Sequence, residues 1–588
     1  MCGICGEISF SGPRGREDLS RVTDAMSSRG PDAAGLLAQG PLAFGHRRLS
    51  ILDLSAASQQ PMVDSELGLG IVFNGCIYNF REIRLELVGK GYRFFSQGDT
   101  EVILKSYHAW GTDCVRRFKG MFAFAIWERD SGRVVLVRDR LGIKPLYYTE
   151  NSERFRFAST LPALLAGGKI DSSLDPVALH HYFSFHAAVP APRTVLRGVR
   201  KLPPATILTI EPDGSRSSQT FWELEIGEIE SDRRSDHEWI EAVAVEMKMA
   251  VDRRRVADVP VGVLLSGGLD SSLLVALLSE LGQEDLRTFS IGFESVNGHS
   301  GDEFRYSDII ASRFGTNHQQ IRIDAGRVLS ALPSTIRAMS EPMVSHDAVA
   351  FYLLSEEVAK QVKVVQTGQG ADEVFGGYSW YPPFLGINDP SDEYQRRYFD
   401  WGHADLEKLL EPEYLREDAS FAFVDSFFSK VRSGSAIDKV LELDTKIMLV
   451  DDPVKRVDNM SMAFGLEARV PFLDHDLVEL AARIPARLKV SGGGKHVLKE
   501  AARRFVPAEV IDRPKGYFPV PALRYLRGPF LDFVREIFSQ SAARHRGIYR
   551  KEFVDHMLAE PEAEMSPKGH SRLWQAALFE GWLQTHGI

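Results

Sequence analysis

The stretch that decides the fold of the second half of the chain is VGVLLSGGLDSSLLVALLSELG, residues 261–282. Residues 261–265 are apolar without alternation, which predicts a strand buried on both faces of a parallel sheet. The turn Ser266-Gly267-Gly268 follows, and the apolar run after Ser272 predicts a helix. Because ligands bind beyond the carboxyl ends of strands in such sheets, SGGLDSS is the predicted start of a binding site.

The chemistry of this loop indicates phosphate binding. Glycines let the backbone approach an anion, the helix N-terminus presents free N–H groups, and serine hydroxyls add donors. The loop lacks the G-K-[ST] of a Walker motif. Its pattern is typical of loops in which ATP is cut between its α and β phosphates, so the predicted ATP-binding residues are Ser266, Gly267, Gly268, Leu269, Asp270, Ser271 and Ser272. A glycine turn capped by serines, without a ligand, is the weaker interpretation.

An acidic residue inside an anion-binding loop implies a cation. Asp270 would repel phosphate unless a metal lies between them, and Mg²⁺ is the oxygen-liganded ion that usually serves phosphates. Asp372 in TGQGADE, after the strand-like VKVVQ, is the predicted second ligand. Enzymes with such loops activate a carboxylate as an adenylate, which an amine then attacks, so this half of the chain needs a source of nitrogen.

The first six residues, MCGICG, offer that source. Cys2 and Cys5 have three interpretations: a redox dithiol, half of a metal site, or a nucleophile at Cys2. A structural zinc site wants four ligands, and the chain has no second C-x-x-C. Removal of Met1 would give Cys2 a free α-amine with a pKa of about 7.7 to 8, a suitable base for its own thiol. Cys2 is therefore predicted to attack glutamine and release ammonia through a thioester.

Further residues complete the predicted glutamine site. Asn74 and the N–H of Gly75, in FNGCIYN, are candidates for the oxyanion hole of the tetrahedral intermediate. Arg48 in HRRLS and Asp99 in GDTEVIL would pair with the α-carboxylate and α-ammonium of the substrate.

Length and composition set the outer limits. A chain of 588 residues predicts two or more domains. Short β-rich segments predict a layered α+β sandwich over residues 1–205, a junction over 206–235, and a parallel-sheet α/β domain over 236–588. The net charge of −10 disfavours nucleic-acid binding. The sequence has no long apolar run or signal peptide and few cysteines, so we expect a cytoplasmic protein without membrane contact.

The motifs MCGICG, RGPD, HRRLSILDL, NGCIYN, GDTEVIL and RDRLGIKPLYY together resemble the class II glutamine amidotransferase domain. DVPVGVLLSGGLDSS, TGQGADEVFGGY, GLEARVPFLD and RPKGYF resemble the synthetase domain of glutamine-hydrolysing asparagine synthetases. This resemblance implies an αββα N-terminal-nucleophile (Ntn) hydrolase sandwich, followed by a PP-loop ATPase domain of the adenine nucleotide α-hydrolase type, with an ammonia tunnel between them. It also implies ATP, Mg²⁺ and glutamine as ligands. Leu264, Ile291, Thr367 and Gly368 would line the adenosine site, and residues 266–270 would hold the pyrophosphate.

Two positions depart from that family. Cys76 stands where asparagine synthetases typically have an acid that contacts the ammonium of glutamine, which leaves Asp99 to make that contact. Gln369 stands where they typically have an acid in the TGQGADE loop. An amide cannot act as a base at ordinary pH. Either another group takes that role, or the acceptor chemistry differs.

The segments between these motifs resemble the N-acetylglutaminylglutamine amidotransferase branch of the family, as in RAMSEPMVSHDAVAFYLLS, GGYSWYPP and GFESVNGHSGDEF. That resemblance implies amidation of a dipeptide's terminal carboxylate to give an osmoprotectant. The candidate acceptor residues are Gln369, Glu341, Asp347, Lys455, Arg456 and the aromatics around Trp380; a salt-bridged or core position is the ordinary alternative for each. The alternative acceptor is aspartate, and a third possibility is amidation of a polysaccharide or cyclising substrate. From a different functional class, the chain could be a non-catalytic sensor of glutamine or nucleotide. Retention of Cys2, Asp270 and Asp372 disfavours the sensor, and a homodimer stays open.

Overall fold

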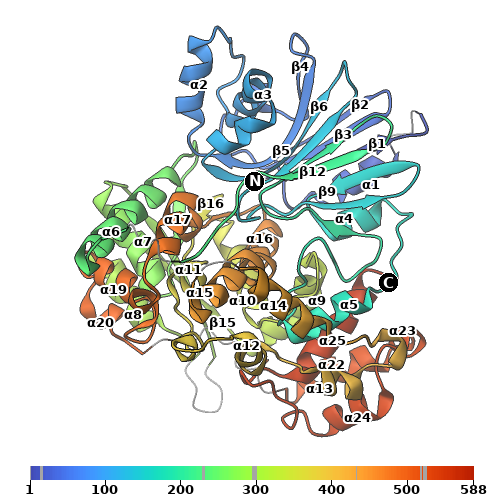
Figure 1. Ribbon diagram of the computed structural model, residues 1–588, viewed down its shortest axis with the longest axis vertical. Helices are drawn as coiled ribbons and strands as arrows, with labels where there is room; N and C mark the ends of the chain where they lie inside the picture. The colour runs from blue at the N-terminus through green and yellow to red at the C-terminus, as the bar shows by residue number, and fades with distance from the viewer. Residues whose placement is uncertain are drawn as a thin grey trace.

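The computed structural model describes residues 2–12, 17–227, 232–294, 301–431, 434–514, 516, 520, 523 and 526–588. Met1, the whole stretch SVNGHS and parts of RPKGYF, which belong to the motifs quoted above, lie outside these residues. Figure 1 shows a sandwich of sheets formed by the first part of the chain, seated on a larger α/β and helical body. Within the described residues, no helix combines the length and apolarity that crossing a membrane requires.

The N-terminal part consists of two six-stranded sheets with helices on both outer faces. The first sheet has the strand order β10-β8-β9-β1-β3-β2 and the second β12-β11-β7-β6-β5-β4. The strands of the first are β1 (Gly3–Ser9), β2 (Ala33–Gln39), β3 (Leu42–Arg48), β8 (Tyr147–Glu150), β9 (Arg154–Ala158) and β10 (Arg200–Lys201). Those of the second are β4 (Met62–Asp64), β5 (Leu69–Ile77), β6 (Gly120–Glu128), β7 (Val134–Arg138), β11 (Thr206–Ile210) and β12 (Arg216–Thr220).

Helices complete this αββα arrangement. The first sheet packs against α1 (Glu17–Asp24) and α4 (Leu161–Ala166), and the second against α3 (Asp99–Trp110), next to α2 (Phe80–Gly89). Fully buried apolar side chains fill the space between the sheets, among them Ile4, Phe44, Val72, Ala125 and Phe157. The layered sandwich that the short β-rich segments predict is thus confirmed.

The sandwich extends past its predicted end at residue 205. Residues 206–220, which the sequence analysis places in the junction, form the hairpin of β11 and β12 at the edge of the second sheet, where β11 pairs with β7. The prolines before Thr206 indicate a boundary, because proline is rare within strands, and the strand that follows them is therefore not predicted. The strand β11, with the sequence TILTI, is mostly buried: Thr206, Ile207, Leu208 and Ile210 all lie in the interior. Every residue of its neighbour β12 is exposed, as expected of a polar strand at the edge of a sheet.

The second half contains a five-stranded sheet in which every neighbouring pair is parallel. Its order is β15-β14-β13-β16-β17. The strands are β13 (Val261–Leu264), β14 (Arg287–Phe293), β15 (Asn317–Ile323), β16 (Val364–Gln366) and β17 (Glu467–Arg469). The chain runs outward from β13 in one direction and from β16 in the other, so the topological switch point lies between these two strands. Crevices for ligands open at such points, beyond the carboxyl ends of the strands.

Helices surround this sheet and continue into a C-terminal helical region. Those around the sheet are α6 (Asp236–Arg253), α7 (Leu269–Glu280), α8 (Phe304–Phe314), α9 (Ala325–Ala338), α10 (Asp347–Val358), α11 (Ala371–Phe375), α16 (Lys455–Met462), α17 (His475–Arg483), α18 (Ala486–Val490), α19 (His496–Ala502) and α20 (Ala508–Ile511). The others are α12 (Ser391–Tyr398), α13 (His403–Leu409), α14 (Ala419–Lys430), α15 (Ala436–Leu443), the π-helical η5 (Asp444–Met448) and η6 (Val450–Val454), α22 (Pro529–Ser539), α23 (Ser541–Arg546), α24 (Lys551–Ala559) and α25 (Arg572–Thr585).

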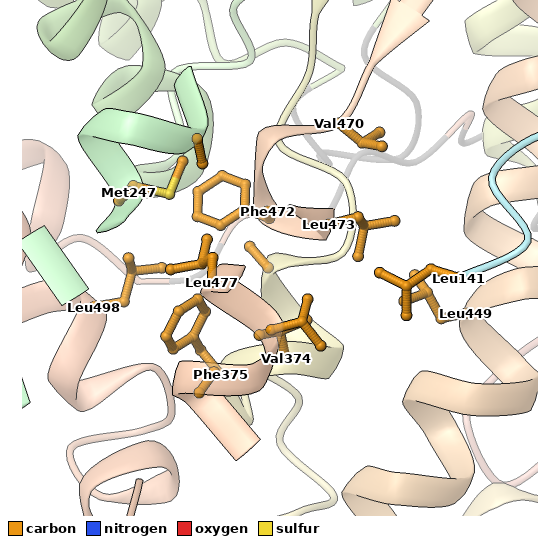
Figure 2. Close-up of a cluster of buried hydrophobic side chains, with 14 of the residues drawn as sticks. Leu141, Met247, Val374, Phe375, Leu449, Val470, Phe472, Leu473, Leu477 and Leu498 are labelled. Atoms are coloured by element: carbon orange, nitrogen blue, oxygen red, sulfur yellow. The ribbon is translucent and has the colours of Figure 1, made fainter. Parts of the chain in front are cut away.

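The two halves share a core. Figure 2 shows Phe472, Leu473 and Leu477, which follow β17, packed with side chains of α6, α11 and α19, while Leu141 reaches in from the sandwich. In addition, α5 (Pro176–Ser184) leaves the sandwich and lies beside α25, where Tyr182 donates a hydrogen bond to the Gln575 carbonyl (3.2 Å). The buried contact between the halves holds their relative orientation through apolar burial.

Candidate active site

Cys2 lies at the start of β1, where the first sheet meets the second half of the chain. Its side chain is 8% exposed. Its backbone N–H donates to Asn74 Oδ1 (2.9 Å), and its carbonyl accepts from Arg29 Nε (3.3 Å). Burial raises the pKa of the Cys2 thiol above its ordinary value, so the thiol needs a base to become a nucleophile.

The two predicted oxyanion donors lie beside Cys2 on β5. Asn74 is fully buried, and its Nδ2 has no hydrogen-bond partner among the described residues, although Oδ1 holds Cys2. An unpaired buried donor is costly, and a ligand oxygen is the partner that would satisfy it. Gly75 has φ +157°, and a Cβ there would overlap the carbonyl oxygen of Met121. Only glycine fits, which brings the backbone into the wall of the Cys2 cavity.

Arg48 and Asp99, predicted to bind the ends of glutamine, line the same cavity. Arg48 ends β3 and donates to the carbonyl oxygens of Asp53 and Ser55, which hold its guanidinium in place. Asp99 begins α3 and accepts from the N–H of Ile77 (2.9 Å). Burial raises the pKa of Asp99 to about 6, so this carboxyl is ionised at neutral pH and protonated in mild acid.

Three residues near Cys2 come from positions where the family pattern was broken or no role was predicted. Cys76 is buried, and Arg469 Nη2 lies 3.9 Å from its sulfur. Arg469 and Glu467 belong to β17 of the other sheet and both line the Cys2 cavity. Burial would raise the pKa of Glu467, but Arg469, 2.6 Å away, and Lys144 help to hold it to about 2. Sequence reasoning assigned GLEARVPFLD to the family without giving these two residues a role.

The cavity at Cys2 measures about 40 Å³, room for a few water molecules. Residues of the segment after β3, Leu49, Ile51 and Leu52, form part of its wall.

The SGGLDSS loop joins β13 to α7, as its sequence predicts. Gly268 is the N-cap of α7, and the N–H of Gly268 donates to Ser266 Oγ (3.3 Å). Gly267 has φ +74°, and a Cβ there would lie 2.6 Å from the backbone nitrogen of Ser307. The hydroxyl of Ser272 is buried without a hydrogen-bond partner among the described residues. The loop thus presents a helix N-terminus and the residues Ser266 and Ser271 toward one cavity, a cradle suited to phosphate.

The two acids predicted to hold Mg²⁺ converge on one lysine. Lys495 Nζ lies 2.7 Å from Asp270 Oδ2 and 2.9 Å from Asp372 Oδ1. Burial would lower the pKa of Lys495, but the two carboxylates raise it above its ordinary range. Lys495 ends the run SGGGK, in which all of Gly492, Gly493, Gly494 and Lys495 have positive φ. The glycines allow this backbone path. Three consecutive glycines before a lysine are a recognisable pattern in the sequence, but the sequence analysis gives Lys495 no role.

One cavity of about 1460 Å³ contains the nucleotide loop and continues well beyond it. Of the residues predicted to bind ATP, those that line it are Leu264, Ser266, Gly268, Leu269, Asp270, Ser271, Ile291, Thr367 and Gly368, while Gly267 and Ser272 lie behind its wall. Single sites for drug-sized ligands measure about 300 to 1,000 Å³. The volume is therefore enough for a nucleotide and a second substrate of considerable size.

The acceptor candidates separate into two groups. Gln369, Asp347, Arg456 and Trp380 line the large cavity. Arg456 Nη2 lies 3.8 Å from Asp347, whose pKa burial raises to about 6. Glu341 and Lys455 do not line it: Glu341 lies 3.1 Å from Lys201 Nζ and 3.5 Å from Lys455 Nζ, among buried charges between the two halves.

Buried ion pairs also join the halves near Cys2. Arg29 Nη1 lies 2.8 Å and Lys144 Nζ 3.4 Å from the carboxylate of Asp458, and all three side chains are at most 4% exposed. Nearby, β17 lines the Cys2 cavity and is bonded to a residue of the nucleotide cavity: Arg469 pairs with Gln366, and its carbonyl accepts from the N–H of Thr367 (2.9 Å), which lines the nucleotide cavity. The two cavities have no lining residue in common among those described.

Comparison with known proteins agrees with this geometry. Residues 1–222 match the family model of the glutamine amidotransferase domain, and residues 242–584 match that of asparagine synthase. The chain is 31% identical to asparagine synthetase [glutamine-hydrolyzing] 1 of Bacillus subtilis, covering 99% of this chain and 96% of that protein. It is 32% identical to a putative asparagine synthetase [glutamine-hydrolyzing] of Mycobacterium tuberculosis, covering 99% and 97%.

Among solved structures, a glutamine phosphoribosylpyrophosphate amidotransferase from B. subtilis matches at 15% identity over 54% of this chain and 65% of that one, with a TM-score of 0.30. A likeness this distant carries no argument about function. The family models and the full-length relatives do, and they agree with a buried Cys2 in the first half and a glycine-rich loop at the switch point of the second. The chain belongs to the asparagine synthase family and is a glutamine-dependent, asparagine-synthetase-like amidotransferase.

Proposed function

We propose that Cys2 releases ammonia from glutamine and that the large cavity adenylates an acceptor carboxylate, on which ammonia forms an amide. The carrying observation is that a buried cysteine, beside an amide donor with no partner among the described residues, shares a cavity wall with β17, a strand of the sheet whose β13 leads into the nucleotide loop. Cytoplasmic location is part of the proposal, since a reducing compartment keeps Cys2 a thiol. A homodimer is a further proposal, which light scattering would test.

In the first half-reaction, the Cys2 sulfur attacks the side-chain carbonyl carbon of glutamine. The α-amine freed by removal of Met1 takes the thiol proton. Asn74 Nδ2 and the Gly75 N–H donate to the oxygen that becomes negative. Collapse of the tetrahedral adduct expels ammonia, which carries the transferred proton, and leaves a thioester that water hydrolyses to glutamate. Arg48 and Asp99 orient the α-carboxylate and α-ammonium.

In the second half-reaction, the acceptor carboxylate attacks the α-phosphorus of ATP and displaces pyrophosphate. Backbone N–H groups and hydroxyls of residues 266–272 would hold the phosphates. Asp270 and Asp372 would hold Mg²⁺ in place of the Lys495 ammonium on which their carboxylates converge beside that cradle. When bound, the ion neutralises phosphate charge. Lys495, which lies between the acids, is placed to contact phosphate oxygens. Ammonia then attacks the acyl carbon and AMP leaves.

We further propose an ammonia path between the sites that runs past β17. This strand lines the Cys2 cavity, and its Arg469 carbonyl accepts from the N–H of Thr367 at the nucleotide cavity. The helix α16, which carries the buried carboxylate of Asp458, packs on the same strand. Ammonia that stays inside the protein remains unprotonated and nucleophilic. In bulk water at neutral pH it would take up a proton and lose the lone pair that attacks the acyl group.

For the acceptor, we propose the terminal carboxylate of N-acetylglutaminylglutamine, which makes the product an osmoprotectant. Three features support this: the volume of the cavity, its continuation past Trp380 toward the segment before α25, and Gln369 in the TGQGADE loop. Aspartate is the alternative, and the names of the full-length relatives favour it.

The test supplies ammonia directly, so that the glutamine site does not limit the reaction, and measures release of pyrophosphate from ATP. We expect N-acetylglutaminylglutamine to give a kcat/KM at least about 100-fold above that of aspartate. Faster turnover of aspartate would replace the peptide proposal with asparagine synthesis. Absence of both pyrophosphate release and glutamine hydrolysis would favour a non-catalytic sensor.

A further inference from the structure

Residues 254–258, which we call the brace, lie between the end of α6 and the start of β13. They belong to the second half of the chain, yet their hydrogen bonds reach the wall of the Cys2 cavity. Beyond the brace, β13 leads directly into the nucleotide loop. No residue of the brace lines the Cys2 cavity itself, so the brace can act on glutamine only through the residues that it holds.

Asp258 holds the turn that follows β3 by two hydrogen bonds. Its N–H donates to the Ile51 carbonyl (2.9 Å), and its carboxylate oxygen Oδ2 accepts from the N–H of Asp53 (2.7 Å). These bonds hold the backbone on either side of Leu52, and both Ile51 and Leu52 line the Cys2 cavity. A hydrogen bond to a carboxylate is stronger than one between neutral groups, so the bond from Asp53 is the more important of the two.

Asp53 passes this restraint on to Arg48. The carbonyl oxygen of Asp53 accepts from Arg48 Nη2, and that of Ser55 accepts from Arg48 Nη1 (2.8 Å). Asp53 has a left-handed φ of +46°, a conformation that a residue with a side chain keeps only where its surroundings hold it. Ser58 Oγ binds its carboxylate from within the sandwich (2.6 Å), and Asp258 binds its N–H from the other half. The direction of the Arg48 guanidinium therefore depends on Asp258.

The brace also holds Arg469, the second arginine of the Cys2 cavity. Arg469 Nη1 donates to the carbonyl oxygens of Arg254 (2.8 Å) and Val256 (2.7 Å). Both Arg469 and Arg48 line the cavity. One segment of the second half thus positions two cationic groups there, Arg469 by direct contact and Arg48 through the turn after β3.

A purely structural role for Asp258 is the alternative, in which its bonds only join the two halves. Asp258 is exposed, however, and the halves are already joined by a shared apolar core and by the buried ion pairs of Asp458. Exposed substitutions usually change stability little. Loss of the Asp258 carboxylate should therefore alter the position of the turn more than the stability of the fold.

We propose that Asp258 is a positioning residue of the glutamine reaction, which orients Arg48 toward the α-carboxylate of glutamine by holding the turn after β3. The inference rests on the roles proposed for Cys2 and Arg48, and it assigns part of the glutamine site to the second half of the chain. Arg48 binds the substrate at a distance from the bond that breaks. Removal of the Asp258 carboxylate should therefore weaken glutamine binding more than it slows the chemical step.

The experiment measures glutamate release from glutamine by the full chain, for the wild type, Asp258→Ala, Asp258→Asn and the control Asp252→Ala. Asp252 is a matched control because it is an exposed acid of α6 that pairs only locally, with Arg255 (2.9 Å). Ammonia-driven pyrophosphate release, with the better of N-acetylglutaminylglutamine and aspartate as acceptor, reports on the second half in each variant. Melting temperatures show which variants are folded.

We expect Asp258→Ala to raise KM for glutamine by about tenfold, as loss of a hydrogen bond to a charged group implies, and to change kcat by less than about threefold. Asp258→Asn keeps an oxygen that can accept from the Asp53 N–H, so its KM should stay within about threefold of the wild-type value. Asp252→Ala should match the wild type. Ammonia-driven rates should be the same in all four proteins.

A wild-type KM for glutamine in Asp258→Ala would overturn the positioning role, and so would equal impairment of the alanine and asparagine variants. A joint fall of glutamine hydrolysis and ammonia-driven synthesis, with a lower melting temperature, would show that Asp258 has a structural role alone. If the wild type itself releases no glutamate from glutamine, the role proposed for Cys2 is wrong, and the inference fails with it.

Discussion

Asn74 fixes Cys2 through one atom of its amide and keeps the other for a ligand. Oδ1 accepts from the Cys2 N–H, whereas Nδ2 is buried with no hydrogen-bond partner in the described part of the chain. The sequence FNGCIYN places Asn74 near the oxyanion, but only the structure shows which atom is occupied. An amide oriented in this way is prepared for the charge that develops during glutamine cleavage.

Replacement of the nucleophile should separate the two half-reactions. We expect Cys2→Ala to reduce glutamine-dependent amide formation by at least about 1,000-fold, because no thioester can form, and to leave ammonia-dependent synthesis within about twofold. Cys114→Ala, which removes another fully buried thiol of the sandwich, is the control and should keep both activities. Glutamine use by a folded Cys2→Ala protein would refute the assignment.

Asp99 should give glutamine use a distinctive dependence on pH. Burial raises the pKa of its carboxyl to about 6, and only the ionised form attracts the ammonium of glutamine. As pH falls through 6, Asp99 takes up a proton, so kcat/KM for glutamine should fall by about a further tenfold per pH unit below that point, in addition to the fall that protonation of the α-amine causes, while KM for the acceptor in the ammonia-driven reaction does not follow it. Asp99→Asn should lower kcat/KM at pH 8 and remove the step. A profile that is unchanged in the variant would assign the step to another group.

At the scale of elements, the turn from β13 to α7 depends on one glycine. Gly267 and Gly282 both have left-handed φ, +74° and +70°, but a Cβ at Gly267 meets the backbone of Ser307, whereas one at Gly282 has nothing within 4 Å. Both alanine variants carry the cost of about 1 to 2 kcal/mol of a left-handed alanine. Only Gly267→Ala should also displace the phosphate cradle.

We therefore expect Gly267→Ala to raise KM for ATP by at least about tenfold, and Gly282→Ala to lower the melting temperature without changing that KM. Initial rates of pyrophosphate release against ATP concentration provide the measurement. Similar ATP kinetics in the two variants would show that the close approach to Ser307 has no bearing on nucleotide binding.

Elements with strong local signals were predictable, and long-range neighbours were not. The strand, loop and helix around SGGLDSS follow from their own residues, and so do Cys2, Gly75, Arg48 and Asp99 at one cavity, with Asn74 bonded to Cys2 beside it. Glu467 and Arg469 reach that cavity from about 390 residues further along the chain, and no local pattern encodes such a meeting. For the same reason, α5 looked like part of the sandwich, although it lies among the C-terminal helices.

At the scale of the whole molecule, buried charge ties the halves together. Burial would raise the pKa of Asp458, but Arg29 and Lys144 lower it below its ordinary value. Asp458→Asn would leave two buried cations without their carboxylate. We expect it to destabilise the protein by about 3 to 5 kcal/mol, as loss of one partner in a buried pair does. The fall in thermal unfolding midpoint checks this.

A matched control is the exposed pair between the halves formed by Lys363 and Asp32, 2.8 Å apart. Lys363→Met should cost no more than about 1 kcal/mol, because solvent screens such pairs. If the two variants melt at similar temperatures, burial around Asp458 contributes little to joining the halves.

The strand β17 has a consequence for how this enzyme can be divided. A fragment that stops at the end of the sandwich would contain Cys2 but lack Glu467 and Arg469, which form part of the wall around it. The Cys2 cavity is therefore completed only when the distant second half of the polypeptide has folded against the first. Under the role proposed for Cys2, we expect an unfinished chain to hydrolyse little glutamine.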